Sequence, residues 1–201
     1  MTPLERVILG RRSCRRMRNR PAIPREDLIR LVRAGCHAPS GYNSQNYRFI
    51  VIDDPAEIAR LSAIKQPTAL SSLAAAWIAV VSDDSAHLDV KPHEYHIWSK
   101  LWTQNCAAAI QNILLLATHM GYASCWLSHV REMDGTRLLS GLTWRELFAD
   151  YALPPMASPH GIVLLGWPQD VSGGFPKGDA THGRRPVARR AAETYILPRR
   201  T

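Results

Sequence analysis

The stretch Ala38-Pro-Ser-Gly-Tyr-Asn-Ser-Gln-Asn-Tyr-Arg-Phe49 lies between a segment with helical periodicity and an alternating apolar segment. Pro39 cannot continue a helix, so the stretch is expected to be a loop that leads from a helix into a strand. Ser40, Asn43 and Gln45 both donate and accept hydrogen bonds, which suits a heterocycle with carbonyl and N–H groups side by side. An ordinary helix-to-strand connection uses the same residue types, so the loop alone leaves both interpretations open.

The segments on either side of the loop predict a helix and a strand. Positions 24–38 begin with a proline, carry acidic residues in the first turn, and place Leu28, Leu31 and Val32 on one face. Positions 47–52 are rich in aromatic and β-branched residues, which is typical of a strand.

Further helices are expected at 3–9, 55–64, 102–120 and 144–151, and further strands at 77–81, 123–130 and 161–167. The apolar strand 77–81 is expected to be covered on both faces. The helix 102–120 is apolar almost all round and is therefore expected to be buried, in the core or against another subunit. With 201 residues, of which 46% are hydrophobic, the chain has the size of a single domain with a substantial core.

A basic segment, Gly10-Arg-Arg-Ser-Cys-Arg-Arg16, precedes all of these strands. Guanidinium groups present paired donors that match phosphate oxygens, and they keep their charge at any working pH. Phosphate is therefore the first candidate ligand of this segment, and a solvated basic turn is the alternative.

The motif Arg11-Arg12-Ser13-x-Arg15, followed by the 38–49 loop, resembles the FMN-dependent nitroreductase family. Three later stretches are similar to landmarks of that family and occur in the same order: Gly121-Tyr-Ala-Ser-Cys-Trp-Leu127, Gly161-Ile-Val-Leu-Leu-Gly-Trp-Pro168 and Arg184-Arg-Pro186. The resemblance implies an α+β fold, a nitroreductase-like α/β sandwich whose central, mostly antiparallel sheet is flanked by helices, in an intertwined homodimer. It also implies one FMN-binding domain over 1–201, with a lid-like insertion at about 84–100 and a C-terminal arm, 186–201, that packs on the partner subunit.

The same resemblance implies which residues contact FMN. The basic residues near both ends of the chain would hold the phosphate, with Arg15 near N1 and O2 of the flavin, and the backbone at 126–128 would face N5 and O4. The 38–49 loop would approach the flavin bound mainly by the other chain, with Gln45 bracing the loop. The implied cofactor contacts are Arg11, Arg12, Ser13, Arg15, Pro39, Ser40, Gly41, Asn43, Gln45, Gln66, Trp126, Leu127, Ser128, Arg184 and Arg185.

Two residues depart from the family's pattern. Asn46 stands where the family very often has Pro, and is expected to loosen the loop. His129 stands where Gly is usual, and would crowd the flavin edge, add a titrating group there, or lie as a polar residue at the end of a strand.

The sequence lacks the nucleophile elbow of serine hydrolases, the Walker phosphate loop and the Rossmann dinucleotide fingerprint. The resemblance implies an FMN-dependent oxidoreductase, with ping-pong hydride transfer through the flavin from NADH or NADPH to a nitroaromatic, quinone or similar small-molecule acceptor. No catalytic side chain is singled out, because the flavin carries the chemistry. A non-turnover flavin-binding or flavin-sensing protein is the alternative, and desaturation or flavin fragmentation stays open.

Composition narrows the range of partners. The formal charge of +8 gathers largely at 11–20 and 184–200, and no stacking aromatics accompany these runs, so no nucleic-acid partner is expected. Without a secretory signal or a membrane-spanning run, and with four cysteines in no metal-type spacing, the protein is expected to be cytoplasmic with reduced thiols and no membrane partner. His93 and His96 lack a convincing third ligand, so no metal is expected.

Overall fold

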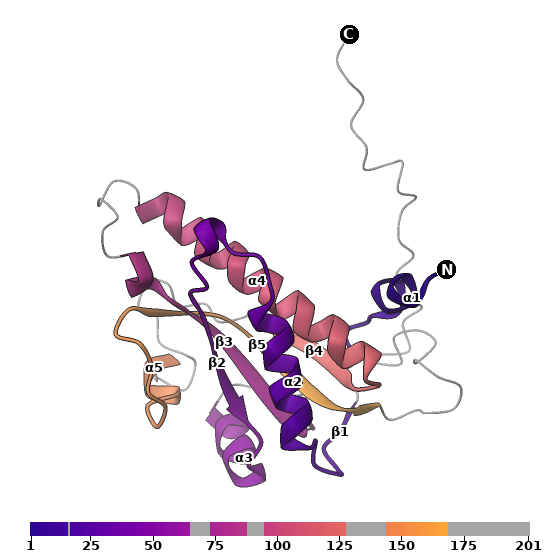
Figure 1. Cartoon of the computed structure of the whole chain (residues 1–201). Coiled ribbons are helices and arrows are strands. Elements are labelled where there is room, and N and C mark those ends of the chain that lie inside the picture. The colour runs from indigo at the N-terminus through magenta and orange to yellow at the C-terminus, as the bar shows by residue number, and fades with distance from the viewer. Residues whose placement is uncertain (16, 65–72, 88–94, 128–143, 169–201) are drawn as a thin grey trace.

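The computed structural model describes residues 1–15, 17–64, 73–87, 95–127 and 144–168 (Figure 1). Its elements, in chain order, are α1 (Pro3–Gly10), β1 (Met17–Arg18), α2 (Arg25–Cys36), the short 3₁₀ helix η1 (Gly41–Asn43), β2 (Tyr47–Ile52), α3 (Pro55–Ile64), β3 (Ala76–Asp83), the 3₁₀ helix η2 (Asp84–His87), α4 (Tyr95–His119), β4 (Ala123–Leu127), α5 (Trp144–Leu147) and β5 (Ala157–Pro168).

β3 and β5 form the centre of a five-stranded sheet. β2 pairs with β3, and β5 pairs with β3, β4 and β1. Each of these pairings is antiparallel, and helices flank the sheet in Figure 1. The predicted α+β fold with a mostly antiparallel sheet is confirmed.

The sheet separates two hydrophobic cores, and β3 contributes to both. Ile78 and Val80 belong to the core on which α2 and α4 pack, whereas Trp77 and Val81 belong to the core that contains apolar residues of α3 and α5. Successive strand residues point to opposite faces, so a strand buried on both sides must be apolar throughout. This is why the run 77–81 predicts a covered strand correctly.

α4 is the longest helix and packs along the first core. Ile110 and Ile113 are fully buried within it, as the all-round apolar pattern predicts. The helix begins at Tyr95, seven residues before the predicted start at Trp102, because the family resemblance predicts a lid-like insertion up to about residue 100. No helix among the described ranges combines the length and apolarity needed to cross a bilayer.

The expected lid-like insertion at about 84–100 overlaps two regular elements. Its beginning is η2, and its end is the first part of α4. Residues 88–94 lie outside the described ranges, and so does the expected C-terminal arm, 186–201, so both assignments stay predictions.

Other boundaries follow the prediction closely at some elements and not at others. β2 and α3 have the predicted bounds, whereas α2 is one residue shorter at its start and two at its end. α5 ends at Leu147 rather than at 151, and β1 was not predicted, because two residues carry no periodicity. β5 begins at Ala157, four residues before the prediction, since its first residues include the half-buried polar side chains of Ser158 and His160, which hide the apolar pattern.

These polar side chains form a hydrogen-bonded cluster at the ends of β3 and β5. The register shifts between Val80 and Val81, which leaves His160 as the extra residue of a bulge. Its Nε2 lies 2.8 Å from Ser82 Oγ, Ser82 donates to the carboxylate of Asp84, and Ser158 donates to the same carboxylate over 2.5 Å. Burial lowers the pKa of His160 to about 4 and raises the pKa of Asp84.

The depressed pKa of His160 predicts a loss of stability in mild acid. Between pH 6.5 and about 4 the unfolded chain binds a proton at this imidazole that the folded chain does not, so the free energy of unfolding should fall by up to about 3 kcal/mol. The raised pKa of Asp84 acts in the opposite sense, so the comparison needs a variant that removes the imidazole alone. We expect His160→Asn to flatten the acid side of the profile in urea unfolding at fixed protein concentration. Parallel profiles for the variant and the natural chain would contradict this assignment.

Candidate functional site

The loop between α2 and β2 has a constrained backbone. Tyr42, Asn43 and Gln45 have φ angles of 53°, 54° and 45°, in the left-handed region that residues other than glycine rarely adopt. Backbone strain of this kind costs about 1–3 kcal/mol per residue and is found preferentially at functional sites. Tyr42 is 83% exposed, so the loop presents an aromatic ring outward.

Three of the predicted site residues hold the loop together from within. The Ser40 hydroxyl accepts a hydrogen bond from the backbone N–H of Gln45 over 3.1 Å, and the Gln45 side-chain amide donates to Asn43 Oδ1 over 3.0 Å. Gln45 therefore braces the loop through both its backbone and its side chain.

The expectation that Asn46 loosens the loop is wrong. Asn46 is fully buried, and its Oδ1 accepts a hydrogen bond from Asn105 Nδ2 of α4 over 3.0 Å. The Asn46 carbonyl also accepts from the N–H of Asp83, at the end of β3. Asn46 thus ties the loop to a helix and to the sheet.

The basic segment runs from the end of α1 to a position beside β4. The Arg11 N–H bonds to the Val7 carbonyl and closes the helix, and the Cys14 N–H donates to the Ser124 carbonyl of β4 over 2.8 Å. Arg11, Ser13 and Arg15 are each half-buried along this path. The structure therefore brings part of the predicted phosphate site together with the strand predicted to face the flavin.

Arg12 is more exposed than Arg11 and Ser13 beside it. Its guanidinium group donates to the carbonyl oxygens of Leu9 and Arg11, over 2.6 and 2.8 Å, and the residue is exposed. Its charge thus lies at the C-terminal end of α1, where it complements the helix dipole.

Trp126 of β4 packs closely against β5. A Cβ atom added at Gly161 would lie 2.3 Å from Trp126 Nε1, so glycine is required there for the indole to fit. This indole nitrogen is buried and has no hydrogen-bond partner among the described residues. Leu127 follows it, half-buried, at the end of the strand.

Within one chain, the loop and the basic segment lie along different parts of α4. The loop contacts the first half of α4, at Leu101 and Asn105, whereas α1, which precedes the basic segment, lies beside the C-terminal half, near Leu116 and His119. Figure 1 shows α1 beside the C-terminal end of α4. Leu116 follows Asn105 by eleven residues, or roughly 16 Å of helix.

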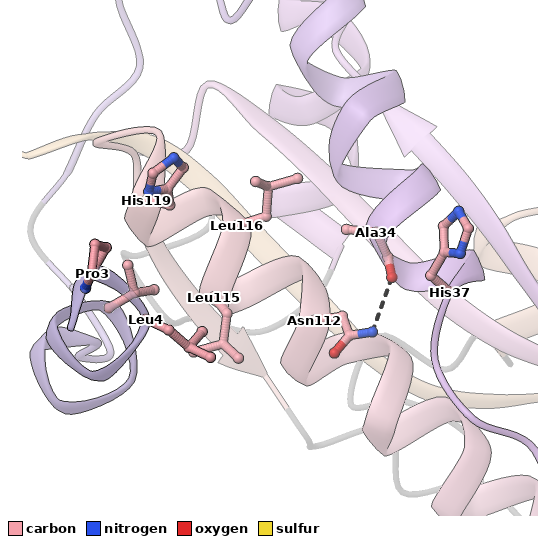
Figure 2. A pocket seen from close by; sticks show the side chains of 9 residues that line it. Pro3, Leu4, Ala34, His37, Asn112, Leu115, Leu116 and His119 are labelled. Carbon is pink, nitrogen blue, oxygen red and sulfur yellow. Dashed lines mark hydrogen bonds between the residues drawn. The ribbon is translucent and has the colours of Figure 1, made fainter.

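A groove of about 440 Å³ separates α1 from α2 and α4 (Figure 2). Its walls are mostly apolar and contain none of the predicted site residues. They are formed by Pro3, Leu4, Val7, Ala34, His37, Asn112, Leu115, Leu116 and His119.

A sequence profile of the nitroreductase family matches residues 8–102 and 74–149, which together cover more than half of the chain. The chain belongs to the nitroreductase family. This confirms the resemblance found in the sequence, and with it the expectation of a nitroreductase-like oxidoreductase.

Individual relatives of this nitroreductase agree with that assignment. A protein of Archaeoglobus fulgidus named NADH dehydrogenase/NAD(P)H nitroreductase is 31% identical over 165 residues, 82% of this chain and 85% of its own. A nitroreductase of Desulfovibrio desulfuricans, solved in complex with FMN, is 25% identical with a TM-score of 0.70, covering 100% and 99% of the two chains. An NADH dehydrogenase/NAD(P)H nitroreductase of Bacteroides thetaiotaomicron has the same fold, with 22% identity, a TM-score of 0.72 and the same coverage.

Several expected contacts of this nitroreductase lie outside the described residues. They are Gln66, Ser128, Arg184 and Arg185, and the departure at His129 lies there too. Their roles stay predictions. Asn105, by contrast, was missed in the sequence, because Thr103 and Gln104 beside it are polar as well and no local pattern distinguishes it.

The family's proline at position 46 should not fit this nitroreductase. Proline disfavours a helical or left-handed conformation in the residue before it, and Gln45 is left-handed here. Asn46→Pro would also remove the acceptor of the Asn105 hydrogen bond. We expect a loss of about 2–4 kcal/mol in the free energy of unfolding, measured with urea. Asn46→Ala, which removes only the side-chain bonds, should cost about half as much, and equal losses would refute the backbone argument.

Proposed function

We propose that this nitroreductase is an FMN-dependent NAD(P)H oxidoreductase that reduces a small organic acceptor, such as a nitroaromatic compound or a quinone. The main support is the hydrogen bond that ties the Arg11–Arg15 segment to β4. It brings the segment that is predicted to bind phosphate next to the strand that the family resemblance assigns to the flavin edge. The relative solved with FMN is consistent with this cofactor.

The donor set fits a flavin mononucleotide. Arg11 and Ser13 would hold the phosphate through forked and hydroxyl donors, and Arg184 would join them. Arg15 would lie near N1 and O2, where a positive charge stabilises negative charge on the reduced ring. The buried Trp126 Nε1 has no hydrogen-bond partner among the described residues, so this N–H would be a donor for a ligand beside the strand.

Bound FMN would accept a hydride from NADH or NADPH and pass reducing equivalents to the acceptor. The chain's residues would bind and orient it, and one pocket would admit nucleotide and acceptor in turn, as a ping-pong order requires. A cytoplasmic location belongs to the same proposal, and all four cysteines are free thiols as that location would require.

We also propose that the site is completed by a second copy of the chain. The loop and the basic segment lie about three helical turns apart along α4 within one chain, so the Ser40 and Asn43 of one copy would meet the flavin held by the other. Exposed apolar side chains such as Leu4, Ile8 and Ile29 on α1 and α2 offer surface for such a homodimer.

The first test is an absorbance spectrum of the purified protein, with added FMN and then, without oxygen, with NADH or NADPH. We expect flavin bands that bleach with at least one nucleotide and recover when a quinone is added. Bands that persist with both nucleotides would indicate a flavin-binding protein without turnover. Failure to bind FMN at all would refute the proposal.

Two neighbouring arginines provide a matched test of the phosphate site. Arg11→Ala should weaken FMN binding about tenfold to a hundredfold, because a charge-assisted hydrogen bond is lost. Arg12→Ala should weaken it by about threefold at most, since its guanidinium group is engaged at the end of α1. Titration of the flavin-free protein by quenching of flavin fluorescence measures both, and equal losses would contradict the assigned roles.

A mixed dimer tests the two-chain site. One chain would carry Arg11→Ala and Arg15→Ala, and the other Ser40→Ala and Asn43→Ala, so each pure dimer has two damaged sites. A mixed dimer, isolated through two different affinity tags, has one intact site. We expect it to bind one FMN tightly and to recover about half of the natural activity. A mixed dimer no better than either parent would show that each chain builds its own site.

A further inference from the structure

Asn105 of α4 is almost completely buried, at 4% exposure, and its side-chain amide makes all its hydrogen bonds to one loop. Its Oδ1 accepts from the Gly41 N–H over 3.0 Å, and its Nδ2 donates to Ser44 Oγ over 3.1 Å and to Asn46 Oδ1 over 3.0 Å. One side chain on a rigid helix thus holds three points of the loop.

These three points bracket the strained residues. Gly41 precedes the left-handed pair Tyr42 and Asn43, Ser44 follows the pair, and Asn46 follows the left-handed Gln45. A strained backbone persists only where its surroundings hold it in place. The internal bonds of the loop link its residues to one another, whereas the bonds to Asn105 fix the loop relative to α4.

The arrangement is not the one that stability alone would favour. Asn46 Nδ2 is buried without a hydrogen-bond partner among the described residues, and such a group opposes folding. Stability therefore does not explain why a buried polar pair with one unmatched donor stands here. The geometry of the loop explains it better, because hydrogen bonds between buried polar groups specify one arrangement where apolar contacts allow several.

We propose that Asn105 is a positioning residue for the flavin site of the partner subunit. It locks the loop in the left-handed shape that projects the exposed Tyr42 and Asn43 away from their own chain, toward the flavin and acceptor bound by the second copy. This inference rests on the proposed function. It adds a residue that contacts neither cofactor nor substrate and that acts through the loop.

Asn112 provides a matched control on the same helix. It is also an asparagine, it lies about two turns further along, and its Nδ2 donates to the Ala34 carbonyl of α2 over 3.0 Å rather than to the loop. Asn105→Leu and Asn112→Leu each remove amide hydrogen bonds of α4, and only the first releases the loop. Asn105→Asp keeps the acceptor for the Gly41 N–H and serves as a second variant if the leucine variant does not fold.

The first readout needs no flavin. Hydrogen exchange in the flavin-free protein should become at least tenfold faster at the backbone N–H groups of Ser44 and Gln45 in the Asn105 variants, and should be unchanged there in Asn112→Leu. Unchanged exchange in the Asn105 variants would overturn the inference whether or not the protein binds FMN. A natural chain that binds no FMN would refute the proposed function, and with it the site to which the loop is assigned.

The second readout connects the loop to the site. We expect Asn105→Leu to weaken FMN binding about tenfold and to raise the acceptor KM more than it lowers kcat, with changes below about twofold in Asn112→Leu. If Asn105 acts through Asn43, the double variant Asn43→Ala/Asn105→Leu should bind FMN about as weakly as the weaker single variant. The inference would be overturned if the losses of FMN affinity from the two substitutions multiplied in the double variant, or if Asn112→Leu lost as much affinity as Asn105→Leu. Either result would leave Asn105 only a structural role.

Discussion

The burial of α4 against the sheet is the constraint on which the rest of the structure depends. Its middle, including Ile110 and Ile113, is fully buried between α2 and the central strands, so the helix cannot shift or rotate without opening the core. Both parts of the candidate site lie along this helix. The loop contacts its first half, and the basic segment lies near its C-terminal end. Their separation within one chain is therefore set by the path of this helix.

Polar groups inside the core are used where the chain must take an unusual path. Asn46 and Asn105 hold a loop with three left-handed residues, and the Ser82, Asp84 and His160 cluster accompanies the bulge between β3 and β5. Both groups pair polar atoms with one another because an unpaired buried polar atom is costly.

Local sequence patterns predicted much of the fold. β2 and α3 have the predicted bounds because a proline or an acidic turn closes each side of a clear pattern, and the run 77–81 predicted a strand covered on both faces. The start of α4 and the first residues of β5 were not predicted. In β5 the polar residues have partners that are distant in the chain: Ser158 bonds to Asp84 of η2, and His160 bonds to Ser82 of β3.

The sequence by itself determined the family, the order of the motifs and the residue types that suit a phosphate and a flavin, because these depend on local chemistry and spacing along the chain. Only the tertiary structure decided what each motif can reach. It directs the Arg12 guanidinium group to carbonyl oxygens at the end of α1. It also buries Asn46, which the sequence predicts to loosen the loop, and bonds it to Asn105, 59 residues away. It also separated the loop from the basic segment along α4. Contacts between residues far apart in the chain depend on how helices pack on the sheet, and no local pattern specifies that packing.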